Sequence, residues 1–101
     1  METIFFNLQK PYAIKMQSLI KILGENLFVD KFINYHINRL KREIARMQIK
    51  LEKYEEKYEM RSSQFYEQFD NGELGDAKDY MLWAGIYEFQ MDSKKQLIQL
   101  I

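Results

Sequence analysis

The chain of 101 residues has 47% hydrophobic residues, 15 basic and 15 acidic residues, and no cysteine. This length and composition favour one domain, or a small domain with an extension, and exclude a disulfide framework and cysteine-ligated zinc. The zero net charge hides a division: residues 1–50 hold nine Lys/Arg and four Asp/Glu (+5), and residues 51–101 hold six and eleven (−5). No signal-peptide pattern opens the chain and no apolar run is long enough to span a bilayer, so we expect a cytoplasmic protein without a membrane segment.

The first segment alternates as a β-strand does. Ile4, Phe6 and Leu8 fall on one face, and Thr3, Phe5, Asn7 and Gln9 fall on the other. A single strand must find a partner for its main-chain N–H and C=O groups. The same strand of a second copy would supply one, in a two-stranded ribbon, so we predict a homodimer or a higher homo-oligomer. The alternative is a frayed or helical start to an all-α protein, because short apolar runs fit both structures.

The rest of the chain shows helical spacing. The pattern predicts a helix over 12–23 closed by Gly24, a turn at Glu25-Asn26, and a long helix over 28–59. A short helix capped by Ser62-Ser63 and a last helix over 77–97 capped by Asp76 should follow. The long helix carries a heptad stripe, which needs a cover. The stripe consists of Ile33, Ile37, Leu40, Ile44, Met47, Leu51, Tyr54 and Tyr58.

Residues suited to catalysis are few. His36 is the only histidine, and a lone helical histidine is more often structural than catalytic. The acidic run from Asp70 to Asp79 lacks the alternating spacing of a calcium loop, and turn formation explains it better. We therefore predict no catalytic residues, no metal site and no cofactor, and a protein that is not an enzyme.

Residues 2–45, in the order strand, proline, helix, turn, helix, resemble the ribbon-helix-helix family of dimeric DNA-binding repressors. The resemblance is carried by Phe6-Asn7-Leu8-Gln9-Lys10-Pro11, Leu23-Gly24 and Asp30-Lys31-Phe32-Ile33. It implies a mainly α fold with one N-terminal β-strand. It also implies operator DNA as a partner, with bases contacted by Phe5, Asn7 and Gln9 and phosphates contacted by Lys10 and Lys31. The turn between the helices is longer than the family's, and no Ser or Thr caps the second helix.

The stretch 58–76, together with Trp83-Ala84-Gly85-Ile86-Tyr87-Glu88, resembles the C-terminal part of small prokaryotic proteins of toxin–antitoxin gene pairs. This implies a dimerisation and DNA-binding part over 1–45 and a helical extension over 46–101 that binds a toxin. The acidic second half would suit a basic toxin. The predicted partner-binding residues are Phe65, Phe69, Tyr80, Trp83 and Tyr87. These aromatic residues could instead form the core of a helical hairpin with residues 51–58.

Two interpretations follow from these features. The first is a DNA-binding, antitoxin-like transcriptional autorepressor that binds a toxin through its C-terminal helices. The second is an all-helical coiled-coil interaction protein that binds another protein and no DNA.

Overall fold

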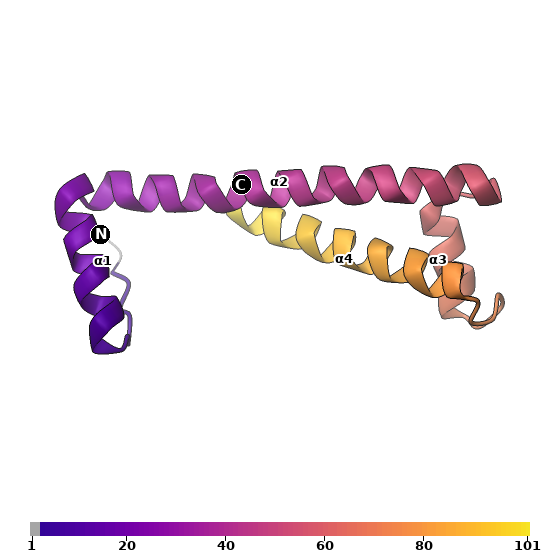
Figure 1. The fold of residues 1–101 in the computed structure, drawn as a ribbon, viewed down its shortest axis with the longest axis horizontal. Helices are drawn as coiled ribbons and strands as arrows, with labels where there is room; N and C mark the ends of the chain where they lie inside the picture. The colour runs from indigo at the N-terminus through magenta and orange to yellow at the C-terminus, as the bar shows by residue number, and fades with distance from the viewer. Residues whose placement is uncertain (1–2) are drawn as a thin grey trace. The chain divides into compact units, whose positions relative to one another are not determined.

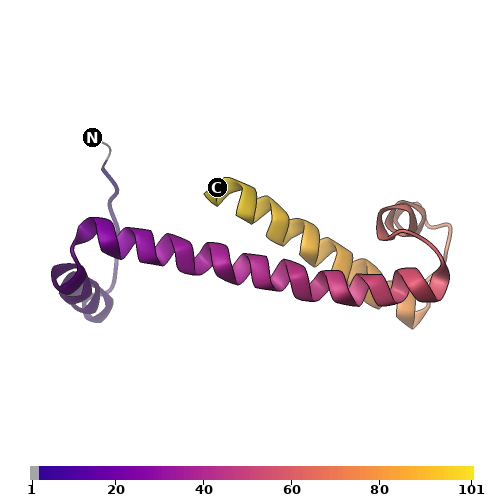
Figure 2. The ribbon, with the colours of Figure 1, turned by 90° about the horizontal axis from the view of Figure 1, so that it is seen from above.

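A computed structural model describes residues 3–101, which fold into four helices (Figures 1 and 2). They are α1 (Lys10–Leu23), α2 (Glu25–Tyr58), α3 (Ser62–Asp70) and α4 (Lys78–Leu100). The chain divides into two compact units, an N-terminal unit that ends at Tyr35 and a C-terminal unit that begins at His36. Because α2 crosses this boundary, its first turns belong to one unit and the rest to the other.

The predicted ribbon-helix-helix fold with an N-terminal β-strand is wrong, because residues 3–101 contain no strand. Residues 3–9 are exposed and precede α1 without regular secondary structure. Alternation alone does not make a strand, since its main-chain groups need an extended neighbour. No other extended segment of the described chain pairs with these residues, and the all-α alternative is the one observed.

The ends of α1 follow from one proline and one glycine. Pro11 lies in the first turn, where a missing N–H costs nothing, and Gln9 before it is extended (φ −63°, ψ 147°). Gly24 closes the helix as predicted, at φ 83°, and its N–H donates to the Ile20 carbonyl at 2.6 Å. The turn predicted at Glu25-Asn26 is wrong, because α2 begins at Glu25 directly after this glycine.

In the C-terminal unit, Glu55 organises the corner between α2 and α3. Glu59 adopts φ 51° and ends α2, and the Met60 N–H donates back to the Glu55 carbonyl at 3.2 Å. The Glu55 carboxylate then accepts the Ser62 N–H at 2.7 Å, at the positive end of α3. Ser62 was predicted as a cap, but it lies inside α3, whose N-cap is Arg61.

A turn with two glycines at positive φ, Gly72 and Gly75, connects α3 to α4. Ala77 rather than Asp76 is the N-cap of α4, and no side chain caps it. α4 is tied to α2 through Gln90, whose buried amide donates to the Ile44 carbonyl at 3.1 Å and to Gln48 Oε1 at 3.0 Å. The last helix therefore packs back on the second half of α2, which is one of the two interpretations that the sequence left open.

The core of the C-terminal unit is an aromatic stack. Trp83 and Phe65 are fully buried, and their rings lie parallel (3°) with centroids 3.8 Å apart. The ring centroids of Tyr54 and Tyr58 of α2 each lie 5.6 Å from the Trp83 ring centroid. Dispersion and burial of these large rings hold the three helices together.

Removing one hydroxyl from this core should lower stability measurably. The Trp83 indole N–H donates to Ser62 Oγ at 2.9 Å, and both residues are buried. Ser62→Ala leaves that N–H unsatisfied, so we expect a loss of about 1–3 kcal/mol in the free energy of unfolding in urea. Ser63→Ala is the matched control, because Ser63 is exposed, and it should change stability by less than about 0.5 kcal/mol. Equal effects of the two variants would contradict the prediction.

Candidate functional site

The residues predicted to contact DNA lie on the surface of the N-terminal unit. Phe5, Asn7 and Gln9 belong to the segment before α1, Lys10 is the first residue of α1, and Lys31 lies in α2. All five are exposed. The base-reading role depended on the alternation of a strand, so it has lost its structural basis. DNA binding by this chain stays a prediction.

The aromatic residues predicted to bind a partner lie largely in the chain's own core. Phe65 and Trp83 are fully buried, and Phe69, Tyr80 and Tyr87 are half-buried. Phe65 and Trp83 are therefore core residues, as the helical-hairpin interpretation predicts. A partner would reach only the exposed edges of the other three.

Hydrogen bonds from two tyrosine side chains connect α4 to α3 and to α2. The Tyr66 hydroxyl of α3 donates to Glu88 at 2.6 Å, and this hydrogen bond raises the pKa of Tyr66 to about 12. Asp79, in the first turn of α4, accepts hydrogen bonds from Lys57 at 2.8 Å and from the Tyr58 hydroxyl at 2.6 Å. These two bonds lower the pKa of Asp79, and the bond to Asp79 raises the pKa of Lys57.

The N-terminal unit exposes its apolar side chains. None of residues 3–35 is buried. A large amount of exposed apolar surface on a soluble protein is typical of an interaction site. We call these side chains the N-terminal apolar surface: Ile4, Phe5, Phe6, Leu8, Tyr12, Ile14, Leu19, Ile22, Leu27, Val29, Phe32, Ile33 and Tyr35.

A groove of about 450 Å³ lies between α2 and α4 in the C-terminal unit. Its lining residues are Glu43, Arg46, Met47 and Lys50 from α2, and Met81, Leu82, Gly85, Ile86 and Phe89 from α4. Leu82 is 48% exposed and Phe89 is 59% exposed. This groove was not predicted from the sequence, although Leu82, Ile86 and Phe89 are spaced four and three apart and form a second apolar stripe on α4.

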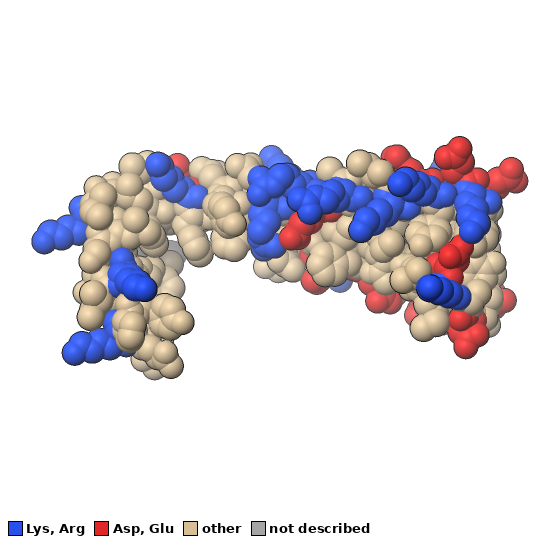
Figure 3. All heavy atoms as spheres, viewed as in Figure 1, with Lys and Arg blue, Asp and Glu red and all other residues tan. Residues whose placement is uncertain are grey.

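Basic side chains border the groove on the α2 side. Figure 3 shows Lys and Arg gathered along the second half of α2. We call Arg42, Arg46, Lys50 and Lys53 the basic row; their spacing of four, four and three places them on one face of the helix. None of the four forms an ion pair within residues 3–101.

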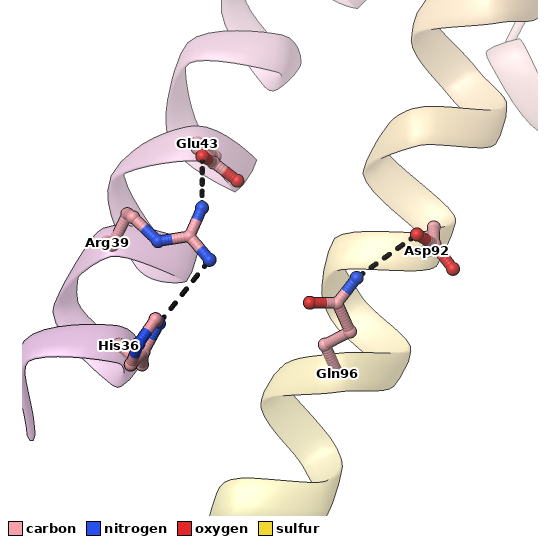
Figure 4. A network of polar contacts seen from close by, with 5 residues as sticks. All are labelled: His36, Arg39, Glu43, Asp92 and Gln96. Atoms are coloured by element: carbon pink, nitrogen blue, oxygen red, sulfur yellow. Dashed lines mark hydrogen bonds and ion pairs between the residues drawn. The ribbon is translucent and has the colours of Figure 1, made fainter. Parts of the chain in front are cut away.

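Two other cations of α2, Arg39 and Lys57, are in contrast paired with carboxylates. Arg39 forms an ion pair with Glu43 at 2.8 Å, and its other terminal nitrogen lies 3.5 Å from His36 Nδ1 (Figure 4). At the far end Lys57 is paired with Asp79. The only carboxylate that lines the groove, that of Glu43, is thus already neutralised, and the groove has a positive edge.

Comparison of the chain with family models, with curated proteins and with solved structures finds no match. Within residues 3–101, no three His, Asp or Glu side chains gather closely enough to hold a metal ion. None of the helices in that range has an apolar stretch of the length that crossing a bilayer requires. The functional interpretation therefore rests on the N-terminal apolar surface and on the groove between α2 and α4.

The Asp79 contacts predict how stability depends on pH. Because the pKa of Asp79 is lowered from 3.8 in the folded state, its contribution is present above pH 3.8 and is lost as the pH falls through the folded value. Asp79→Asn should therefore be less stable than the wild type at neutral pH, and the difference should shrink in acid.

Urea unfolding at neutral and at acidic pH measures this difference. Asp76→Asn is the matched control, since Asp76 is exposed and forms no hydrogen bond or ion pair within residues 3–101. A stability difference between wild type and Asp79→Asn that stays constant with pH would contradict the assignment.

Proposed function

We propose that this protein is an all-helical protein-binding module that self-associates through its N-terminal apolar surface and binds a partner protein through its C-terminal unit. The observation that supports it best is the contrast between the two units. The C-terminal unit buries an aromatic core, whereas none of residues 3–35 is buried. Exposed apolar surface is unfavourable by roughly 25 cal/mol per Å². A binding partner that buries this surface would therefore stabilise the protein.

A second copy of the chain is the occupant we propose for the N-terminal apolar surface. The heptad stripe of α2 is covered from within the chain at Leu40, Met47 and Leu51, but Ile33 at its start is 39% exposed. The five aromatic side chains of this surface expose on the order of 600 Å². The exposed apolar area of residues 3–35 is therefore of the same order as the roughly 800 Å² per partner that a standard interface buries. In a two-fold dimer the same surface would face its own copy.

An antitoxin-like role is the partner relationship that we propose for the C-terminal unit. It rests on the resemblance of residues 58–76 and 83–88 to small prokaryotic proteins of toxin–antitoxin gene pairs. The folded core supports it because α4, whose Trp83 is buried, also carries exposed apolar residues such as Leu82 and Phe89. A protein partner would then contact the outer face of α4 rather than the core aromatic residues.

Introducing charge into the N-terminal apolar surface should produce a monomer. We expect the wild type to sediment as a dimer or larger assembly, and Phe32→Glu/Ile33→Glu to sediment as a monomer, because burying the new carboxylates opposes association. Asn34→Glu/Asn38→Glu is the matched control: it adds the same charge at two exposed polar positions of the same helix and should still associate. A monomeric wild type at micromolar concentration would overturn the self-association claim.

Co-expression with the product of the adjacent gene tests the antitoxin-like role. We expect the two proteins to co-purify at a constant ratio, and growth arrest caused by the neighbour alone to be relieved. The Phe32→Glu/Ile33→Glu variant should still form the complex, because its C-terminal unit is unchanged. Separate elution of the two proteins, with no effect on growth, would reject this role.

A further inference from the structure

We propose that the groove between α2 and α4 binds an amphipathic helix of a partner protein, with the helix's apolar face on α4 and its acidic residues on the basic row. The inference rests on the proposed role as a protein-binding module and specifies the chemistry of the bound segment.

The apolar wall that α4 contributes, which is also the floor of the groove, has the periodicity that a helix requires. Leu82, Ile86 and Phe89 follow one another along α4 at spacings of four and three, and Met47 of α2 is buried beside them. This row is about 11 Å long, which corresponds to two turns of a bound helix. Apolar anchors at positions i, i+3 or i+4, and i+7 of the partner would match it. Gly85 leaves the middle of the floor open, since nothing lies within 4 Å of the place where its Cβ would be.

The edge of the groove determines the charge of the partner. Arg46 and Lys50 line the groove, and neither forms an ion pair within residues 3–101. Arg42 and Lys53 extend the basic row by one turn at each end, to a length of about 17 Å. Glu43 is held by Arg39, so it does not offset these charges. Carboxylates along one side of a bound helix would meet four cations that form no ion pair within residues 3–101.

Nucleic acid is a poorer match for this groove. A phosphate backbone needs donors and cations, whereas the α4 wall supplies Met81, Leu82 and Phe89, which are exposed and apolar. No Lys or Arg of α4 lines the groove. One basic wall opposite one apolar wall is complementary to an acidic amphipathic helix, which presents both chemistries side by side.

A labelled peptide titrated into the full chain tests the proposal by fluorescence anisotropy. The probe is a four-turn helical peptide with Leu at i, i+4 and i+7 and Glu flanking the leucines. The comparison peptide carries Lys in place of every Glu. We expect the Glu peptide to bind the wild type at least about tenfold more tightly than the Lys peptide does. Arg46→Glu/Lys50→Glu should reverse this preference.

Two further variants separate the groove from general charge effects. Lys41→Glu/Lys95→Glu makes the same change in charge at exposed residues that do not line the groove, and it should keep the wild-type preference. Gly85→Phe fills the floor without changing any charge, and it should weaken the Glu peptide about tenfold or more. Circular dichroism and urea unfolding confirm that each variant is folded.

Several results would overturn the proposal. These are equal binding of both peptides, an equal loss in the Lys41→Glu/Lys95→Glu control, or unchanged binding by Gly85→Phe. A short DNA duplex that binds through Arg46 and Lys50 while neither peptide binds would assign the basic row to nucleic acid instead. The titrations are repeated with Phe32→Glu/Ile33→Glu, the variant expected to be monomeric. Peptide binding in the groove and self-association are thereby tested separately, and either claim can be rejected without the other.

Discussion

The stacking of Trp83 on Phe65 is the interaction on which the C-terminal unit depends. The two fully buried rings lie 3.8 Å apart and join α4 to α3, and Tyr54 and Tyr58 bring α2 against the same indole. The buried indole N–H must find an acceptor, and the Ser62 hydroxyl supplies it at the first turn of α3. The corner at Glu55, the glycine turn after α3 and the return of α4 all serve to bring these groups together.

A small core leaves much of a short chain uncovered. The buried hydrophobic cluster consists of Leu51, Phe65, Trp83 and Ala84, and none of residues 3–35 is buried. A chain of this size can bury only a limited fraction of its apolar surface on folding. Association with another chain would bury more of it. The two surfaces differ in kind, however. The N-terminal apolar surface is broad and suits a second copy, whereas the groove is narrow, has one charged edge and suits a single helix.

Charge at the groove depends on helix face as well as on position along the chain, since three residues of the basic row belong to the basic half 1–50 and Lys53 belongs to the acidic half. By sequence, residues 51–101 carry a net charge of −5, which suggested a basic partner. In the folded C-terminal unit the basic row lies beside an apolar wall, and the carboxylate that lines the groove, that of Glu43, is paired with Arg39. The partner's charge at the groove is therefore set by which side chains remain unpaired, and these cannot be counted from halves of a sequence.

The sequence by itself determined the helices, the glycine that ends α1 and the heptad stripe, because these follow from local spacing and from glycine's access to positive φ. It left open whether α4 or a partner protein covers that stripe. It failed at the N-terminus, where the alternation of Thr3–Gln9 predicted a strand that needs a neighbour the chain does not supply. Only the tertiary structure decided that Trp83 and Phe65 are core, that Ser62 accepts a buried N–H instead of capping a helix, and that Leu82 and Phe89 line a groove. Burial and pairing depend on contacts between residues distant in sequence, and no local pattern of residues specifies those contacts.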